Sequence, residues 1–195
     1  MNKQIDGLVD NYNITTDDSL PDPILIDELS DLSEIGTMDF LGMYMEESGR
    51  HDLLTAVEEV ELAQAIEDGK MAADRLAENN LSGPEQTWLK QIQSKGEGAR
   101  EQLIRANTRL VISFAKRYRG QGLDFMDLIQ EGNIGLLTAV DRFDHRLGNR
   151  FSTYATWWIK QGVTRALANN SREIRIPAHL HTRLRRMNRF RQAME

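Results

Sequence analysis

Apolar residues recur every three to four positions along much of the chain, which is the spacing of one face of an α-helix. The clearest example spans residues 150–166, where a buried stripe is predicted at Ala155, Ile159, Val163 and Ala166. Ser152 precedes this run and is a favoured N-cap residue. We therefore predict a helix that starts near Thr153.

Capping residues predict two earlier helices. Thr37 can cap the first, and Thr55 with Glu58 forms a capping box at the start of the second. We expect the second helix to end before Gly69, because glycine is common just past a helix end. Its predicted buried stripe is Val60, Ala63 and Ile66.

Residues 70–98 form a variable segment with the weakest pattern. The run Ser82, Gly83, Pro84 predicts a break and then a new helix through Leu89. Residues 95–98 contain two glycines and are typical of a loop. We assign no chemistry to this segment.

Residues 99–142 return to regular helical spacing. An apolar face from Leu103 to Tyr118 predicts one helix, closed by Gly120 and Gly122. Asp124 and Asp127 then open a helix that buries Phe125, Leu128 and Ile129.

The two ends of the chain have different patterns. Residues 1–36 are acidic with little periodicity, which is typical of a flexible tail. Residues 172–176 are expected to be extended before Pro177, because residues that precede proline avoid the helical region, and a basic amphipathic helix follows over 177–195. The fold class is therefore expected to be all-α, with a compact helical bundle over residues 37–176.

Charge is distributed unevenly along the 195 residues. The net charge is −6, but residues 1–99 hold 6 basic against 22 acidic residues, whereas residues 100–195 hold 18 against 8. The second half is therefore the part expected to bind a polyanion. The acidic first half could also pair with it and partly mask that surface.

A second face of the helix at residues 150–166 carries unusual chemistry. Tyr154 and Trp157 give way along it to Gln161, Thr164 and Arg165. Aromatic rings stack on bases, and amide, hydroxyl and guanidinium groups contact base edges and phosphates. Both tryptophans could instead be core residues. The surrounding cations favour a nucleic-acid-binding role over a core role. These cations are Arg146, Arg150, Lys160, Arg165, Arg172 and Arg175.

Several function classes are not expected. The absence of cysteine excludes disulfides and thiolate metal sites and fits a cytoplasmic location. No apolar run reaches membrane-spanning length, and the N-terminus lacks the features of a signal peptide. No metal or cofactor motif is present, so no cofactor is expected.

Two alternatives from other classes remain for comparison. A nuclease could use Glu58, Glu59 and Glu61 as metal ligands, but these positions diverge around a helix and cannot converge on one ion. No set of residues therefore indicates an enzyme. A helical adaptor that binds only protein is the second alternative, and paired tryptophans in a basic half argue against it.

The longest motif is DLIQEGNIGLLTAVDRFDHRLGNRFSTYATWWIKQGVTRALANNSREIRIPAHL at residues 127–180. It resembles the second region of the sigma-70 family of bacterial sigma factors and the start of the third. Residues 39–69 resemble the region that these factors carry upstream, and residues 99–122 extend the match. The resemblance implies a sigma factor that directs RNA polymerase to promoters and melts the minus-ten element.

The resemblance also implies how the DNA is read. Gln161, Thr164 and Arg165 would meet the paired upstream edge of the minus-ten element, and Trp157 with Trp158 would fill the space of the departing base. That adenine would enter a pocket of Phe143, Arg150, Thr153, Tyr154 and Glu59. The last thymine would sit by Asn107, Leu110 and Ser152. Met43, Tyr44 and Met45 would touch the strand just downstream, and His179 the duplex upstream.

The partners implied are promoter DNA, through its non-template strand, and the RNA polymerase core. Asp127, Gln130, Glu131 and Asn133 would bind the coiled coil of its largest subunit, and an anti-sigma or other regulator is a possible further partner. No membrane partner is expected. Two departures from the family pattern stand out: Asn149 replaces a common tyrosine, and nothing resembles the region that reads the minus-thirty-five element.

Overall fold

The computed structural model describes residues 39–78 and 81–177 and the single positions 180, 183, 187, 190 and 194. The described regular elements are all helical, so the all-α prediction is confirmed. The predicted acidic tail, Thr37, His179 and most of the trailing basic helix lie outside the described residues.

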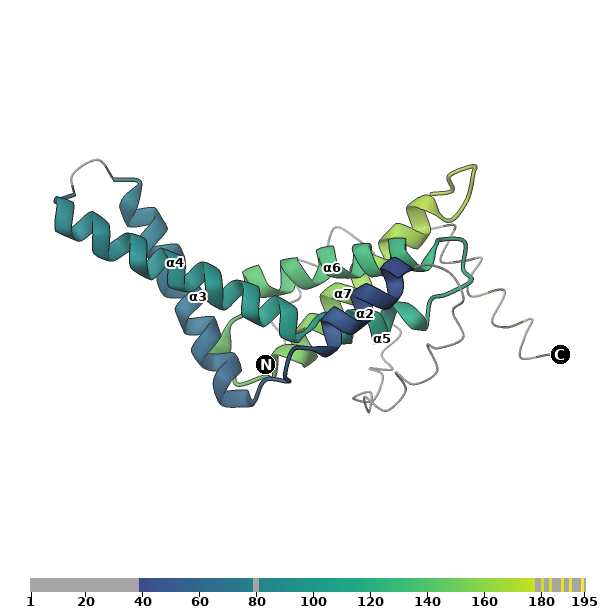
Figure 1. The fold of residues 1–195 in the computed structure, drawn as a ribbon. Helices are drawn as coiled ribbons and strands as arrows, with labels where there is room; N and C mark the ends of the chain where they lie inside the picture. Colours follow the sequence, from purple (N-terminus) through teal and green to yellow (C-terminus); the bar gives the residue numbers. More distant parts are fainter. Residues whose placement is uncertain are drawn as a thin grey trace.

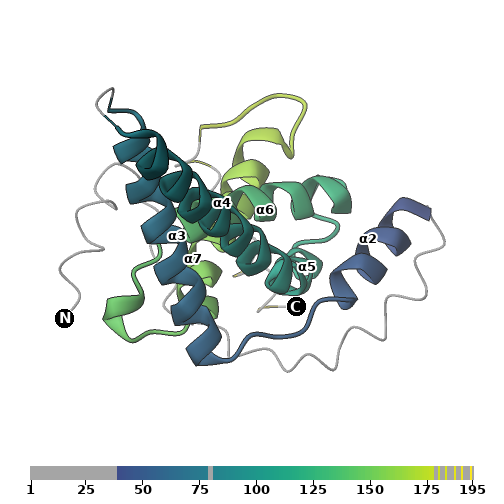
Figure 2. The same cartoon turned by 60° about the vertical axis from the view of Figure 1, so that its left-hand side comes forward.

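The elements follow one another with short connections. They are α2 (Asp39–Gly49), α3 (Ala56–Leu76), α4 (Gly83–Ala106), α5 (Thr108–Lys116), α6 (Phe125–Arg142), the 3₁₀ turn η2 (His145–Leu147) and α7 (Phe151–Asn170). Figure 1 shows α3 and α4 as an antiparallel hairpin that projects from a bundle of α5, α6 and α7, and α2 lies against α5. Figure 2 shows the same hairpin turned so that its tip comes forward, and η2 lies beside α3.

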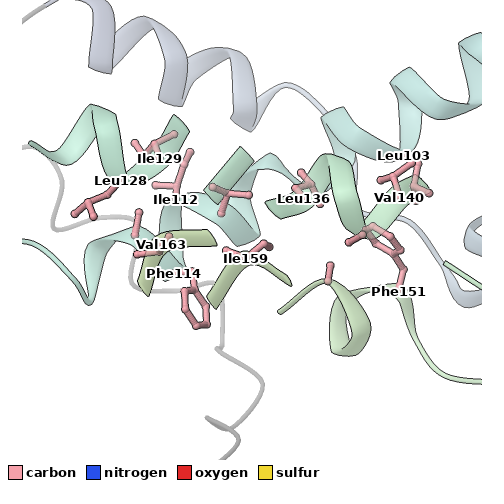
Figure 3. Close-up of a cluster of buried hydrophobic side chains, with 14 of the residues drawn as sticks. Leu103, Ile112, Phe114, Leu128, Ile129, Leu136, Val140, Phe151, Ile159 and Val163 are labelled. Carbon is pink, nitrogen blue, oxygen red and sulfur yellow. The ribbon is translucent and has the colours of Figure 1, made fainter. Parts of the chain in front are cut away.

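The core lies between α6 and α7 and extends to α5 and the end of α4. Its fully buried side chains include Leu103, Phe114, Leu136, Phe151 and Ile159 (Figure 3). Each contributes roughly 1.5–3 kcal/mol by leaving water. The predicted stripe of α7 is confirmed, since Ala155, Ile159, Val163 and Ala166 are all buried.

Glycines allow α6 and α7 to meet at backbone distance. A Cβ atom on Gly135 would lie 2.5 Å from the carbonyl oxygen of Trp158, and one on Gly162 would lie 2.6 Å from that of Glu131. No side chain fits at either position unless the helices separate. The polar face of α6 and the aromatic face of α7 therefore belong to one rigid pair.

Glycines between α3 and α4 correct two predictions. The second helix was expected to end before Gly69, and residues 95–98 to form a loop, but α3 continues to Leu76 and α4 runs unbroken through that segment. A Cβ atom on Gly96 would lie 2.7 Å from the Cα of Gly69. These glycines therefore serve close helix packing and do not end either helix.

The helix predicted from Leu103 to Tyr118 is also corrected, because it is two helices. Asn107 interrupts it with φ −110° and ψ 6°, and its side-chain amide donates to the carbonyl oxygen of Leu103 at 2.8 Å. This hydrogen bond holds the break between α4 and α5. Gly120 and Gly122 have positive φ angles after α5, as a turn requires.

Two of the three side-chain caps predicted within the described residues, those of Thr55 and Asp124, are confirmed. The Thr55 hydroxyl accepts the N–H of Glu58, and the Glu58 carboxylate accepts the N–H of Thr55 at 2.7 Å. The bond from the Thr55 N–H, followed by one from the Thr55 hydroxyl to the same carboxylate, lowers the pKa of Glu58. Asp124 accepts the N–H of Met126 at the start of α6.

Candidate nucleic-acid interface

The start of α7 differs from the prediction that Ser152 caps it. The helix begins at Phe151, and Arg150 occupies the N-cap position without a side-chain cap of its own. The carboxylate of Glu59, on the first turn of α3, accepts the N–H of Phe151 at 2.9 Å. Glu59 is only 5% exposed. The cap therefore comes from another helix, which local sequence could not indicate.

The same carboxylate binds the guanidinium of Arg150. Arg150 donates from Nε and Nη2 to the two oxygens of Glu59 at 3.1 and 3.0 Å, and from Nη2 to the carbonyl oxygen of Leu54 at 3.3 Å. The hydrogen bond to Glu59 raises the pKa of Arg150. Two residues predicted to share a pocket are therefore in direct contact.

Aromatic rings form a continuous cluster next to this pair. Phe143 lies edge-on against Phe151, with ring centroids 5.1 Å apart, and 5.9 Å from Tyr154. The cluster continues from Tyr154 to Trp158 at 6.3 Å and from Trp158 to Trp157 at 4.8 Å. The Tyr154 hydroxyl donates to the carbonyl oxygen of Arg142 at 3.2 Å. Ring contacts thus join the predicted aromatic residues, and Phe151, whose N–H binds Glu59, connects them to the pair of Glu59 and Arg150.

The two tryptophans have different surroundings. Trp158 packs against the core, and its buried Nε1 has no acceptor among the described residues. The Arg142 guanidinium lies over its ring, 4.8 Å from the centroid. Trp157 is half-buried and lies edge-on against Trp158. The core interpretation therefore fits Trp158 better than Trp157.

The second half of α7 carries the predicted polar groups. Lys160, Gln161 and Thr164 are half-buried, and Arg165 is exposed. The Thr164 hydroxyl donates to the carbonyl oxygen of Lys160 at 2.7 Å, which leaves its oxygen able to accept. Ser152 is half-buried, and Thr153, Arg172 and Arg175 are exposed.

The predicted polymerase face of α6 is only partly exposed. Asp127 and Gln130 are exposed, whereas Glu131 and Asn133 are half-buried. The Asn133 amide donates to the Tyr44 hydroxyl at 3.1 Å, so Asn133 joins α6 to α2. Burial raises the pKa of Tyr44.

Residues predicted to contact the last thymine lie at the junction of α4 and α5. Asn107 and Leu110 are half-buried there, and Met45 on α2 packs against the core. Their approach to Ser152 remains a prediction. A cavity of about 120 Å³ between α2 and α5 is lined by Met45, Ser48, Gly49, Arg109 and Ile112.

The acidic and basic halves of the chain do pair. Arg146 donates to both oxygens of Glu67 at 2.6 and 2.7 Å, in addition to the pair between Arg150 and Glu59. Both acidic partners lie on α3. The expected masking therefore affects these two arginines.

Sequence reasoning gave no role to two arginines that lie beside predicted residues, Arg142 at Trp158 and Arg109 at the cavity with Met45. Arg142 lies 16 positions before Trp158, on another helix, so helical spacing gives no signal for their contact. Arg109 sits inside an apolar face in the sequence and becomes notable only through its pocket.

Neither a metal centre nor a membrane span was found in residues 39–78 and 81–177. Acidic and histidine side chains there do not gather in a group able to hold a metal ion. Glu59 is buried while Glu58 and Glu61 are exposed, which is the divergence expected of the three carboxylates. The helices of this part are also too short or too polar to cross a bilayer.

Comparison with known proteins gives two family matches. Sigma-70 region 2 matches residues 103–173, and Sigma-70 factor, region 1.2, matches residues 39–72. The described residues of the interface lie within these two stretches, except Arg175.

Curated relatives point the same way. RNA polymerase principal sigma factor HrdD of Streptomyces griseus is 46% identical over 162 residues, which is 82% of this chain and 49% of that protein. Those of Streptomyces viridifaciens and Streptomyces coelicolor are 47% and 46% identical over 161 residues, which is 82% of this chain and 48% of each protein. The chain therefore spans about half the length of these relatives.

Proposed function

The chain belongs to the sigma-70 family, and from this premise we propose that it recognises and melts the minus-ten element of promoters while bound to the RNA polymerase core. The observation that carries the proposal is the aromatic cluster on α7 beside the pair formed by Glu59 and Arg150. It lies in the half of the chain that holds the excess of basic residues.

The cluster supports base capture. The edge of a base that carries its identity is hidden in duplex DNA, so the base must leave the stack to be read. Phe143 and Tyr154 offer ring faces for the departing adenine, and Glu59, Arg150 and Thr153 surround them with polar groups. Trp157 with Trp158 fills the vacated space. Stacking on one ring is worth roughly 1–3 kcal/mol.

Other residues have supporting roles in this proposal. Gln161, Thr164 and Arg165 contact the paired upstream edge, and Lys160, Arg172 and Arg175 contact phosphates. Asn107, Leu110 and Ser152 receive the last thymine. Met45 touches the strand downstream, and His179 the duplex upstream.

Polymerase binding is assigned to α6. Asp127, Gln130 and Glu131 would contact the coiled coil of the largest polymerase subunit, and Asn133 would contribute while it holds Tyr44. We place this activity in the cytoplasm and assign the chain no catalysis of its own. An adaptor for protein alone would leave the aromatic cluster and its cations without a role.

The proposal is tested with core polymerase and labelled oligonucleotides. We expect the chain to co-purify with core, and the complex to prefer single-stranded TATAAT-like non-template DNA over its complement. Affinity should fall steeply with salt, because Lys and Arg displace counterions from phosphates. Equal affinity for both strands would reduce the interaction to non-specific electrostatics and contradict the proposal.

A further inference from the structure

We propose that Arg109 binds a phosphodiester group of single-stranded DNA in the cavity between α2 and α5. The linkage bound is the one that joins the last base of the minus-ten element to the next nucleotide. This inference rests on the proposed function and adds a phosphate site to it.

Arg109 is a cation without a counter-ion among the described residues. Its Nε is buried and has no hydrogen-bond acceptor there. The neighbouring arginines are paired: Arg105 with Glu101, and Arg50 with Glu46 and Glu47 at 2.9 and 3.1 Å. No described residue balances the charge of this half-buried guanidinium, so an anion that binds its terminal Nη1 and Nη2 groups would neutralise it.

The cavity beside Arg109 has space for an anionic group. Its volume of about 120 Å³ is several times the roughly 10–15 Å³ that a cavity needs to hold one water molecule. Met45 and Ile112 line it with apolar groups, and Gly49 contributes no side chain. The Ser48 hydroxyl already donates to the carbonyl oxygen of Tyr44 at 2.7 Å. Among the residues that the structure describes, Arg109 is the only charged side chain that lines this cavity.

This chemistry matches a phosphodiester. The group carries a single negative charge and has two oxygens that a guanidinium binds as a fork. Apolar walls strengthen the attraction by excluding water. The carboxylates of α2 that could compete for Arg109 are occupied, because Glu46 and Glu47 bind Arg50.

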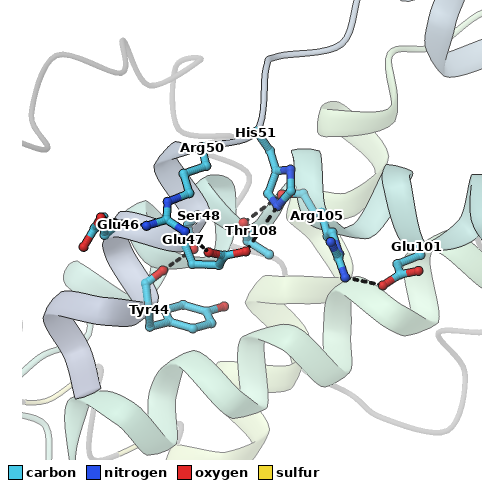
Figure 4. A network of polar contacts seen from close by, with 9 residues as sticks. All are labelled: Tyr44, Glu46, Glu47, Ser48, Arg50, His51, Glu101, Arg105 and Thr108. Atoms are coloured by element: carbon cyan, nitrogen blue, oxygen red, sulfur yellow. Dashed lines mark hydrogen bonds and ion pairs between the residues drawn. The ribbon is translucent and has the colours of Figure 1, made fainter. Parts of the chain in front are cut away.

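The position of the cavity indicates which linkage is bound. Figure 4 shows the end of α2, with Arg50 and His51, close to Arg105 and Thr108 at the junction of α4 and α5. Arg109 follows directly, between Asn107 and Leu110, which receive the last thymine in the proposed function. Met45, assigned to the strand downstream, lines the same cavity. The phosphate within reach of Arg109 therefore lies between that thymine and the next base.

The test replaces single phosphates by neutral methylphosphonates. Non-template oligonucleotides carry one replacement each, scanned along and beyond the minus-ten element, and their affinities are measured for the chain bound to core polymerase. The affinity of wild type should fall roughly tenfold or more when the linkage after the last thymine is replaced. Arg109→Gln should bind the unmodified strand correspondingly more weakly and be insensitive to that replacement, while Arg109→Lys should keep part of the sensitivity.

Arg105→Gln is the matched control, since Arg105 lies four residues away and is already paired with Glu101. It should keep the full sensitivity of wild type. If Arg109→Gln is as sensitive as wild type, or if no linkage there matters to wild type, the inference is wrong. If Arg109→Gln fails to fold, the scan with wild type still shows whether that linkage contributes to binding.

Absence of any preference for the minus-ten sequence would instead remove the proposed function itself, and the inference with it. A variant that loses core polymerase but not DNA would assign the cavity to a polymerase carboxylate and overturn the inference.

Discussion

The carboxylate of Glu59 on α3 accepts the backbone N–H of Phe151 on α7 at 2.9 Å, across 92 positions of the chain. It also holds Arg150, the residue before the helix. The first turn of α7 carries Thr153 and Tyr154, so a side chain on α3 fixes where the proposed base pocket begins. The stretch that matches region 1.2 therefore supports the site on the stretch that matches region 2.

Glu59→Ala should destabilise the protein. The change removes a cap from α7 and a charge-assisted pair from Arg150, which together are worth about 2 kcal/mol. Glu59→Gln should cost roughly half of that, because an amide oxygen still accepts the N–H of Phe151. The measurement is the free energy of unfolding from denaturant titration.

Glu61→Ala is the control for this prediction, since Glu61 lies exposed on the same helix. Its effect should stay within about 0.5 kcal/mol of zero. If Glu59→Ala and Glu61→Ala have the same small effect, the capping role of Glu59 is not supported.

Local signals predicted much of the fold. The capping box at Thr55, the cap at Asp124 and the stripe of α7 depend on residues within one or two turns of each other, and all are confirmed. Apart from the break at Asn107, which a local hydrogen bond to Leu103 holds, the errors came from contacts between distant segments. Gly69 and Gly96 resemble helix-ending glycines until α3 and α4 are packed together, and the cap from Glu59 needs the folded bundle.

Two glycines on α4 should respond oppositely to alanine. A Cβ atom on Gly96 would lie 2.7 Å from the Cα of Gly69, whereas one on Gly98 has nothing within 4 Å. Gly96→Ala should therefore cost about 1–3 kcal/mol by overpacking. Gly98→Ala should gain about 0.5–1 kcal/mol by lowering the entropy lost on folding. Thermal and denaturant unfolding of both variants measure this, and a gain at both positions would contradict the close contact of α3 with α4.

The hydrogen bond between Tyr44 and Asn133 should contribute to stability, whereas the exposed residues of α6 should contribute to polymerase binding. Tyr44→Phe and Asn133→Ala should each lower the free energy of unfolding by about 1 kcal/mol. A double-mutant cycle should give a coupling energy, because the two residues share one interaction.

Gln130→Ala should change stability by less than about 0.5 kcal/mol, since Gln130 is exposed. It should nevertheless weaken retention on immobilised core polymerase. Unchanged retention of a folded Gln130→Ala chain would remove Gln130 from the proposed polymerase interface.

For the site, too, local patterns were predicted and contacts between distant segments were not. The aromatic and basic residues of α7 were visible as a second face of one helix, and the structure places Phe143, Tyr154 and Trp158 in contact. Arg142 and Arg109 were not predicted, because their importance depends on a ring and a cavity formed by other helices. The approach of Asn107 and Leu110 to Ser152 remains a prediction.

Trp157 should matter for opening DNA more than for binding duplex DNA. Unstacking and unpairing a base costs a few kcal/mol, and stacking on an aromatic ring returns roughly 1–3 kcal/mol, so the exchange is close to balanced. Loss of one ring should therefore shift the equilibrium toward the closed complex by roughly tenfold or more. Closed binding depends instead on phosphate contacts and on Gln161, Thr164 and Arg165.

Trp157→Ala and Tyr154→Ala should accordingly impair open-complex formation on a duplex promoter. The same variants should impair it much less on a promoter already unpaired across the minus-ten element. The measurement is open-complex formation by the chain with core polymerase on both templates, with circular dichroism to confirm folding. Trp88→Ala is the matched control, because Trp88 is 60% exposed on α4, outside both family matches. Trp88→Ala should leave open-complex formation unchanged on both templates.

Trp157 packs edge-on against Trp158 and not against the core cluster, so its loss should leave the fold intact. If Trp157→Ala impairs both templates equally, the ring does not stabilise the melted state, and its role is packing against Trp158.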